Sequence, residues 1–215
     1  MKLIKAAVFS ALVMASGLIA SAMAQEIPGD AEAGKALYPV CTACHGVNGG
    51  GNQALGAPKI SGQLAFYTLK QLQLFQSGAR GTVAGDMKGM QMAAMSKGPQ
   101  LKSPEGLANL VAYVSSLPDQ ASAKTIQGDA AKGKTAYAVC AACHGAQGEG
   151  NEAMAAPRLT GQSDWYLVAQ LKKFKQGQRG YDNTDHGGRQ MRAMTATLTT
   201  DESMHDVVVY INSLN

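Results

Sequence analysis

The chain places its four cysteines in two copies of one pattern, in which two cysteines are separated by two residues and followed directly by a histidine. The copies are Cys41, Cys44 and His45 in the first half, and Cys140, Cys143 and His144 in the second. This spacing is typical of covalent attachment of a c-type haem, in which both thiols bond to one porphyrin and the histidine reaches the iron. The sequence therefore predicts two covalently bound haem c groups.

Other uses of paired cysteines fit the pattern less well. A structural zinc site takes four ligands per metal, and a redox-active Cys-x-x-Cys requires no histidine after it. A disulfide between thiols only three residues apart closes a small loop and restrains little of the unfolded chain. Haem attachment is therefore the interpretation that uses every cysteine and the histidine beside each pair.

Residues 1–24 have the features of a secretory signal peptide. A basic start is followed by an apolar stretch over residues 6–20 and by the small-x-small pattern of Ala22 and Ala24. The apolar stretch is shorter than the roughly 20 residues that a membrane-spanning helix needs. We expect the mature chain to begin near Gln25 and to reside in the periplasm. Covalent haem attachment is expected in that compartment, outside the reducing cytoplasm.

The remaining length and charge narrow the class of protein further. No segment after residue 24 is long and apolar enough to span a membrane, so the mature chain is expected to be soluble or peripherally bound. The formal charge of +4 falls to +2 without the two lysines of the leader. Because haem propionates bring the loaded protein near neutrality, the basic balance does not indicate nucleic-acid binding.

The chain is an internal duplication. A shift of 99 residues superimposes residues 27–81 on 126–180 without a gap, and 28 of these 55 positions are identical. Residues 118–124 between the copies are polar and are expected to form a short connector. The predicted organisation is a signal peptide over 1–24, a first domain over 25–121 and a second domain over 122–215.

Both halves are expected to be all-helical, with three helices each, because apolar residues recur at helical spacing and strand-like alternation is absent. Residues 107–117 and 204–214 give the clearest apolar stripe, at i, i+3, i+4, i+7 and i+10. The first helix is expected to run from Asp30 to Gly46 in the first half and from Asp129 to Gly145 in the second. The second helix is expected to end at Gly78 or Gly177, and the third to begin at Ser103 or Thr200.

An electron carrier fills the second axial position of the iron with a strong protein ligand. The only candidates that recur at the 99-residue shift are two Met-x-x-Met pairs in predicted loops, which leaves Met92 or Met95 for the first haem and Met191 or Met194 for the second. His186 is a rival ligand that would give bis-histidine iron. The methionines are alternatively core filler, and His205 is expected to be a boundary residue.

Pro58 and Pro157 each follow the histidine of their half by 13 residues. A backbone carbonyl at this point is placed to accept the second imidazole proton and so to orient the ring. An ordinary turn proline explains the same spacing equally well.

With these features together, the chain resembles the di-haem cytochrome c4 family of class I cytochromes c. The resemblance covers essentially the whole mature chain. It rests on the two haem patterns, the Ala-Pro-Lys/Arg-x-x-Gly-Gln segments at 57–63 and 156–162, the Tyr-x-x-x-Gln-Leu helices and the late Met-x-x-Met pairs.

The resemblance implies two tandem cytochrome c domains with haem propionates facing each other across the domain interface. It also implies His45 and Met92 as axial ligands of the first iron, and His144 and Met191 as those of the second. Met95 and Met194 then become packing residues. Crossed first and last helices are implied as well, at Gly34 with Tyr38 and Tyr113, and at Gly133 with Tyr137 and Tyr210.

The leading functional hypothesis is a periplasmic carrier, not an enzyme, that takes single electrons from a donor such as a cytochrome bc complex and delivers them to a terminal oxidase. Its partners are then membrane or soluble redox proteins, and Lys172, Lys173 and Lys175 are candidates for steering an acidic one. An alternative is an electron-transfer subunit of a dehydrogenase, such as flavocytochrome c sulfide dehydrogenase. A small peroxidase or sulfur-compound oxidase is a third hypothesis, and it requires one iron with an open position.

Overall fold

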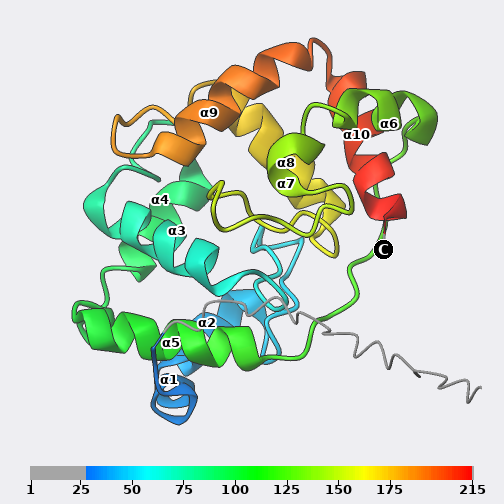
Figure 1. Ribbon diagram of the computed structural model, residues 1–215. Helices are drawn as coiled ribbons and strands as arrows, with labels where there is room; N and C mark the ends of the chain where they lie inside the picture. The colour runs from blue at the N-terminus through cyan, green and yellow to red at the C-terminus, as the bar shows by residue number, and fades with distance from the viewer. Residues whose placement is uncertain (1–27, 215) are drawn as a thin grey trace, which may run out of the picture.

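The computed structural model describes residues 28–214, so the predicted signal peptide lies outside the described residues. Two lobes of helices lie side by side, one formed by the blue-to-green part of the chain and one by the lime-to-red part (Figure 1). The first lobe contains α1 (Ala31–Leu37), α2 (Pro39–His45), α3 (Ala65–Ser77), α4 (Met87–Met95), the 3-10 turn η1 (Pro99–Leu101) and α5 (Pro104–Ser116). The second contains α6 (Ala130–Tyr137), α7 (Ala141–His144), α8 (Asp164–Lys175), α9 (His186–Met194), η2 (Thr195–Thr197) and α10 (Asp201–Ser213).

The all-α prediction is confirmed for the described residues. They contain no β-strand, only one isolated bridge in each lobe, between Asn52 and Ala57 and between Asn151 and Ala156. These bridges close the loop that follows each haem pattern. None of the helices between residues 28 and 214 has the length and apolar character needed to cross a bilayer.

The first helix of each half begins as expected but is interrupted. The carboxylate of Asp30 caps α1 by accepting from Glu32 N–H at 2.8 Å, and Asp129 does the same for α6. The backbone then makes a tight turn at Tyr38 and at Tyr137. The N–H of Cys41 donates to the Tyr38 carbonyl, and that of Cys140 donates to the Tyr137 carbonyl, both at 2.8 Å. The prediction of one continuous helix was therefore wrong, because a tight turn separates the helix start from the segment that carries the cysteines.

The crossing of the first and last helices is confirmed in both lobes. A Cβ atom built on Gly34 would lie 1.9 Å from the carbonyl oxygen of Asn109, and one on Gly133 would lie 2.0 Å from that of Asp206. Only glycine permits backbones to approach this closely. Tyr38 and Tyr113 pack beside the first crossing with ring centroids 5.2 Å apart, and the second crossing repeats this arrangement.

Each lobe has its own hydrophobic core, beneath its crossing helices. The cores consist of Tyr38, Leu101, Leu107, Leu110 and Val114 in the first lobe, and of Tyr137, Leu167, Val168, Leu198, Met204, Val207, Val208 and Ile211 in the second. The apolar stripe predicted for the last helices therefore faces inward. The expected starts at Ser103 and Thr200 are also correct, since each hydroxyl accepts from a backbone N–H three residues later.

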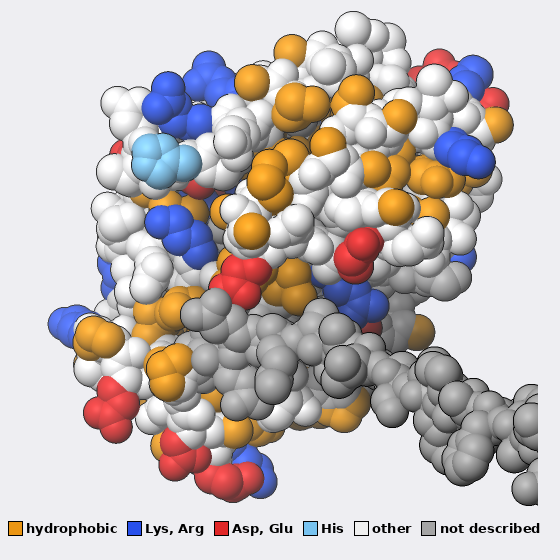
Figure 2. Space-filling view, viewed as in Figure 1, with side chains coloured by type: hydrophobic (Ala, Val, Ile, Leu, Met, Phe, Trp, Pro, Cys, Tyr) orange, Lys and Arg blue, Asp and Glu red, His pale blue; other side chains and the backbone are white. Residues whose placement is uncertain are grey.

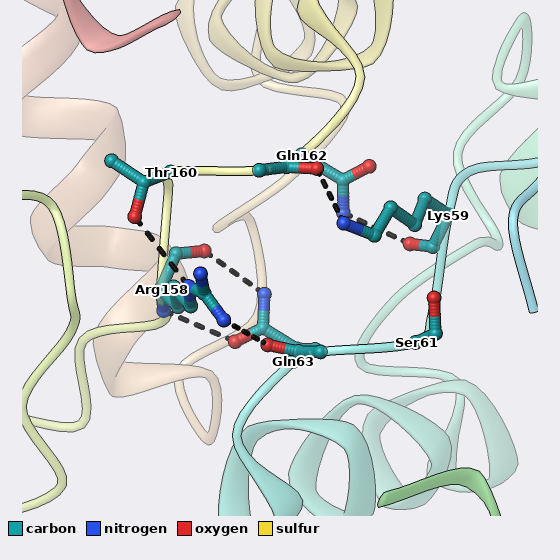
Figure 3. A pocket seen from close by; sticks show the side chains of 8 residues that line it. Lys59, Ser61, Gln63, Arg158, Thr160 and Gln162 are labelled. Atoms are coloured by element: carbon teal, nitrogen blue, oxygen red, sulfur yellow. Dashed lines mark hydrogen bonds between the residues drawn. The ribbon is translucent and has the colours of Figure 1, made fainter. Parts of the chain in front are cut away.

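The two lobes meet through residues 59–63 and 158–162, which run past each other (Figure 3). The Gln63 side chain donates to the carbonyl of Arg158 at 2.9 Å, and the Gln162 side chain donates to the carbonyl of Lys59 at 2.9 Å. Because positions 63 and 162 correspond in the duplication, the contact has approximate twofold symmetry.

The connector between the lobes is packed against this contact and is more than a polar link. The carboxylate of Asp119 pairs with Lys59, whose side chain is 3% exposed, and with Arg158 at 3.1 Å. The Ser122 hydroxyl donates to the carbonyl of Gly161 at 2.9 Å. The connector therefore bonds to both lobes along its course.

Candidate haem sites

Each cysteine pair lies at a short helix that ends at the adjacent histidine. Cys41 and Cys44 lie on α2, whereas Cys143 lies on α7 and Cys140 is the N-cap residue of that helix. All four cysteines are half-buried, and none of them forms a disulfide in the described residues. Burial, and next the neighbouring Cys44, raise the pKa of the Cys41 thiol to about 11, and burial also raises the pKa of Cys140. Because reactive cysteines are thiolates with a lowered pKa, these pairs do not have the character of a redox-active disulfide site.

The histidine of each pattern is buried and held by one nitrogen. His45 is 7% exposed and its Nδ1 lies 2.8 Å from the carbonyl oxygen of Pro58. His144 is 5% exposed and its Nδ1 lies 2.9 Å from that of Pro157. The predicted proline carbonyl contact is thus confirmed in both halves. Since a carbonyl only accepts, Nδ1 carries the proton and Nε2 keeps its lone pair.

The ionisation of these histidines suits a metal ligand. Burial lowers the pKa of His45 and of His144, and it outweighs the opposite effect of the proline carbonyl. Neutral imidazole is the form that coordinates a metal. The local backbone supports this geometry, since the Tyr38 hydroxyl donates to the Gly46 carbonyl at 2.7 Å and Tyr137 makes the same bond to Gly145 at 2.8 Å.

The methionine pairs lie on helices α4 and α9, so the prediction that they occupy loops was wrong. Each helix is started by a buried aspartate: Asp86 accepts from Gly89 N–H and Asp185 from Gly188 N–H, both at 2.9 Å. A Cβ atom at either glycine would lie about 2 Å from the capping carboxylate. Glycine at the third position of each helix therefore leaves room for the capping carboxylate, although its low helix propensity hides these helices in the sequence.

The two members of each methionine pair differ in burial. Met92 and Met191 are half-buried, whereas Met95 and Met194 are 42% and 39% exposed. Met95 and Met194 are thus the more exposed members of the pairs, and their role as packing residues stays a prediction. The rival ligand His186 is exposed at the first position of α9.

A cluster of arginine, glutamine and tyrosine at the lobe interface was missed in the sequence. Arg80 and Arg179, 7% and 3% exposed, each donate to a glutamine of their own lobe and to a glutamine and a tyrosine of the other. The contacts of Arg80 are Gln71 at 2.6 Å, Gln170 at 3.2 Å and Tyr166 at 3.2 Å. Those of Arg179 are Gln170 at 2.9 Å, Gln71 at 3.1 Å and Tyr67 at 3.3 Å. The available signal was that all six residues are identical between the copies.

This cluster concentrates positive charge in a buried place. Burial raises the pKa of Tyr166, but the charges of Arg80 and Arg179 outweigh it and hold the pKa below its usual value. In the described residues neither guanidinium hydrogen-bonds to a carboxylate, and both Nε atoms are buried without a partner. Buried cations with a spare donor are complementary to an anionic group such as a carboxylate.

The residues present fit haem c better than a bare metal. Each half offers two thiols that suit covalent attachment to the porphyrin, and an imidazole with a free Nε2 lone pair and a thioether that suit haem iron. The unpaired arginine donors suit a cofactor that carries carboxylates. Among residues 28–214, no group of three or more His, Cys, Asp or Glu side chains is arranged to hold a metal ion directly.

Comparison with known proteins agrees with this donor set. The family model described as Cytochrome c matches twice, at residues 31–118 and 130–215. Cytochrome c4 of Azotobacter vinelandii is 33% identical over 196 residues, which cover 87% of this chain and 90% of that protein. The chain belongs to the di-haem cytochrome c4 family. Its cofactors are two haem c groups, one bound through Cys41 and Cys44 and the other through Cys140 and Cys143.

Two further relatives place this cytochrome among electron-transfer proteins. The crystal structure of reduced recombinant cytochrome c4 from Pseudomonas stutzeri superimposes with a TM-score of 0.69 and 31% identity, covering 87% of this chain and all of that one. A protein named thiosulfate dehydrogenase electron acceptor, from Stutzerimonas stutzeri strain A1501, is 35% identical over 166 residues, or 72% of each chain. Di-haem electron transfer is therefore the function of this cytochrome.

Proposed function

We propose that His45 and Met92 are the axial ligands of the first haem iron, and that His144 and Met191 are those of the second. The proline carbonyls support the histidines because they fix Nδ1–H and leave Nε2 to coordinate. Burial supports the methionines, since the half-buried member of each pair is the one assigned. When bound, each haem supplies a one-electron couple between ferrous and ferric iron.

We further propose that this cytochrome is a periplasmic carrier of single electrons, from a donor such as a cytochrome bc complex to a terminal oxidase, and not an enzyme. The observation that carries this proposal is the repetition of the full donor set in both lobes. An iron with protein ligands on both faces offers no open position for oxygen or peroxide. The lobes then exchange electrons without changing a substrate.

The proposed processing and domain boundaries accompany this role. Residues 1–24 are assigned to a signal peptide that directs the chain to the periplasm. Residues 25–121 and 122–215 are assigned to the two haem domains, and the separate hydrophobic core in each lobe supports this division.

An electron-transfer subunit of a dehydrogenase is the second candidate, and the relative named thiosulfate dehydrogenase electron acceptor favours it. Flavocytochrome c sulfide dehydrogenase represents the same class of assembly. The two roles differ in how tightly the partner is held, because carriers use small interfaces that dissociate quickly. Isolation of the native protein in a stoichiometric complex that survives gel filtration would favour the subunit role.

Absorption spectroscopy of the ferric holoprotein tests the axial assignment. Met92→Ala and Met191→Ala are each expected to lose about half of the far-red sulfur-to-iron band, because each iron contributes one thioether bond. Met95→Ala and Met194→Ala are the matched controls and should retain the full band. Retention of the full band in Met92→Ala, or binding of carbon monoxide to either iron of the reduced wild-type protein, would contradict the proposal.

A further inference from the structure

The two methionine helices present different surfaces, although they correspond in the duplication. On α9, His186, Arg189 and Arg192 occur at three-residue intervals and all three are exposed. The corresponding positions of α4 are Met87, Met90 and Ala93. The first lobe therefore presents exposed apolar side chains, 68% exposed at Met87 and 43% at Met90, where the second lobe presents basic ones.

The two arginines of α9 have no structural role as partners of an acidic or hydrogen-bonding group in the described residues. Within the described part of the chain, the side chains of Arg189 and Arg192 make no ion pair and no hydrogen bond. The lysines first considered for steering a partner behave differently. Lys172 pairs with Asp201 at 2.6 Å, Lys173 pairs with Asp86, and Lys175 donates to the carbonyls of Leu198 and Thr199.

Helix stability does not explain this arrangement. Two like charges three residues apart on one helix face repel each other and weaken the helix. A basic side chain in the first turn, as at His186, is also unfavourable when charged, because the helix N-terminus carries partial positive charge. The corresponding helix of the first lobe forms without any of these basic groups.

The basic face lies close to the proposed route of the electron. Arg189 and Arg192 line a shallow depression together with Tyr181 and Asn183. Met191, the proposed ligand of the second iron, lies between the two arginines in the sequence and on the inward side of the same helix. Figure 2 shows a histidine and neighbouring basic side chains gathered at the α9 end of this face of the molecule.

We propose that this α9 face, formed by His186, Arg189 and Arg192, is a docking site for the carboxylate-rich surface of a protein redox partner. The proposal rests on the electron-carrier role proposed above and assigns the partner's chemistry at the second lobe. Guanidinium groups pair with carboxylates through two parallel hydrogen bonds, and unpaired basic groups steer acidic proteins into contact. A protein partner is favoured over a membrane surface because Arg189 and Arg192 line a depression, which fits a protruding group of a protein better than a flat lipid surface.

The test measures electron transfer from the reduced holoprotein to oxidised plastocyanin with an acidic patch, by stopped-flow absorption. Each event oxidises one ferrous haem and reduces one cupric ion. Arg189→Met with Arg192→Ala gives α9 the residues of the first lobe, and the rate at low ionic strength is expected to fall roughly tenfold. Lys124→Met with Lys134→Met is the matched control, since it removes the same charge from exposed positions outside α9. It should react nearly as the wild type does.

Salt and vesicle measurements complete the test. The wild type and the α9 variant are expected to converge at high ionic strength, and both should keep the full far-red band. Equal rates at low salt would overturn the docking site while leaving the carrier role intact, whereas no oxidation by plastocyanin or by hexacyanoferrate(III) would overturn the carrier role itself. Binding to vesicles of equal parts phosphatidylcholine and phosphatidylglycerol that requires Arg189 and Arg192, with an unchanged plastocyanin rate, would overturn the site in favour of a membrane surface.

Discussion

The proximal sides of the two lobes are nearly superimposable in their contacts, whereas the surfaces of α4 and α9 have diverged. The histidine-to-proline distances are 2.8 and 2.9 Å, and the tyrosine hydroxyl bonds beside them are 2.7 and 2.8 Å. On the outer faces, methionine in one copy corresponds to histidine or arginine in the other. Both haems impose the same requirement on the chain around them, while each exposed face is free to change with what it contacts.

Substitutions at the helix crossings are expected to have the largest effect on the relative stability of the two lobes. Gly133→Ala places a methyl group against the backbone of α10 and is expected to destabilise the second lobe by about 3 kcal/mol. Trp165, the single tryptophan, lies in that lobe, so its fluorescence during urea unfolding reports the change.

Gly34→Ala is the matched variant in the first lobe, where the clash is equally close. Because each lobe has its own core, it is expected to leave the Trp165 transition near that of the wild type. Equal shifts from both variants would show that the lobes unfold as one unit.

A second difference lies at Asp164, which corresponds to Ala65 in the first lobe. Its carboxylate is fully buried and accepts from Ile126 N–H and the Thr125 hydroxyl at 2.8 Å, and from Trp165 N–H at 2.6 Å. Asp164→Asn is expected to cost about 2 kcal/mol, since hydrogen bonds to a buried charge are lost or weakened. Unfolding of the second lobe in urea measures this cost.

The cost at Asp164 should depend on pH in a definite direction. Burial raises the pKa of this carboxyl, but the hydrogen bonds from Ile126 and its neighbours lower it below the ordinary 3.8. A lowered folded-state pKa gives stability that is complete above the unfolded value and is lost as the pH falls through the folded value. The difference between wild type and Asp164→Asn should therefore be constant near neutral pH and shrink below about pH 4. A difference that grows in acid would contradict this assignment.

The smallest expected effect concerns the ion pair between Lys173 and Asp86. The corresponding lysine position in the first lobe is Leu74, so Asp185 caps its helix without a lysine partner. Its charge interacts with that of Arg179, and one of its oxygens is unbonded. Lys173→Leu removes the lysine, so that neither aspartate has one. Breaking a buried ion pair usually costs about 3–5 kcal/mol, but about 1 kcal/mol is expected here because Asp185 is a buried cap that is tolerated without a lysine. Thermal unfolding measures the loss, and Lys172→Leu, which breaks an exposed pair, should cost less. A cost of several kcal/mol would mean that Asp185 has compensation that Asp86 lacks.

The sequence predicted those features that depend on local spacing. The two haem-attachment patterns and the helix caps at Asp30 and Ser103 each follow from a few neighbouring residues. The close approach at Gly34 joins residues far apart in the chain, and it was expected from the resemblance to the cytochrome c4 family. The helices α4 and α9 were missed because glycine and scattered polar residues hide their short apolar side. A buried aspartate cap contributes to the stability of both helices, and helix propensity does not reveal this contact.

The interface was beyond prediction for a different reason. Arg80 and Arg179 look like surface residues in a sequence, and only the docking of the lobes buries them. Identical polar residues at the shifted positions were the one available indication. Such identity marks a residue as important to both copies, but it does not say that the copies exchange contacts.

Asp119 occurs once in the chain because it lies in the connector that joins the two copies. Its carboxylate bridges Lys59 and Arg158, which are the same position in the two repeats. In a symmetric dimer of identical separate domains, every side chain that lies off the twofold axis occurs twice. Such a dimer therefore cannot place a single carboxylate between two equivalent cations. Fusion into one polypeptide removed that restriction. The peptide segment between the repeats thus supplies a central counter-charge that an unlinked pair of such domains cannot have.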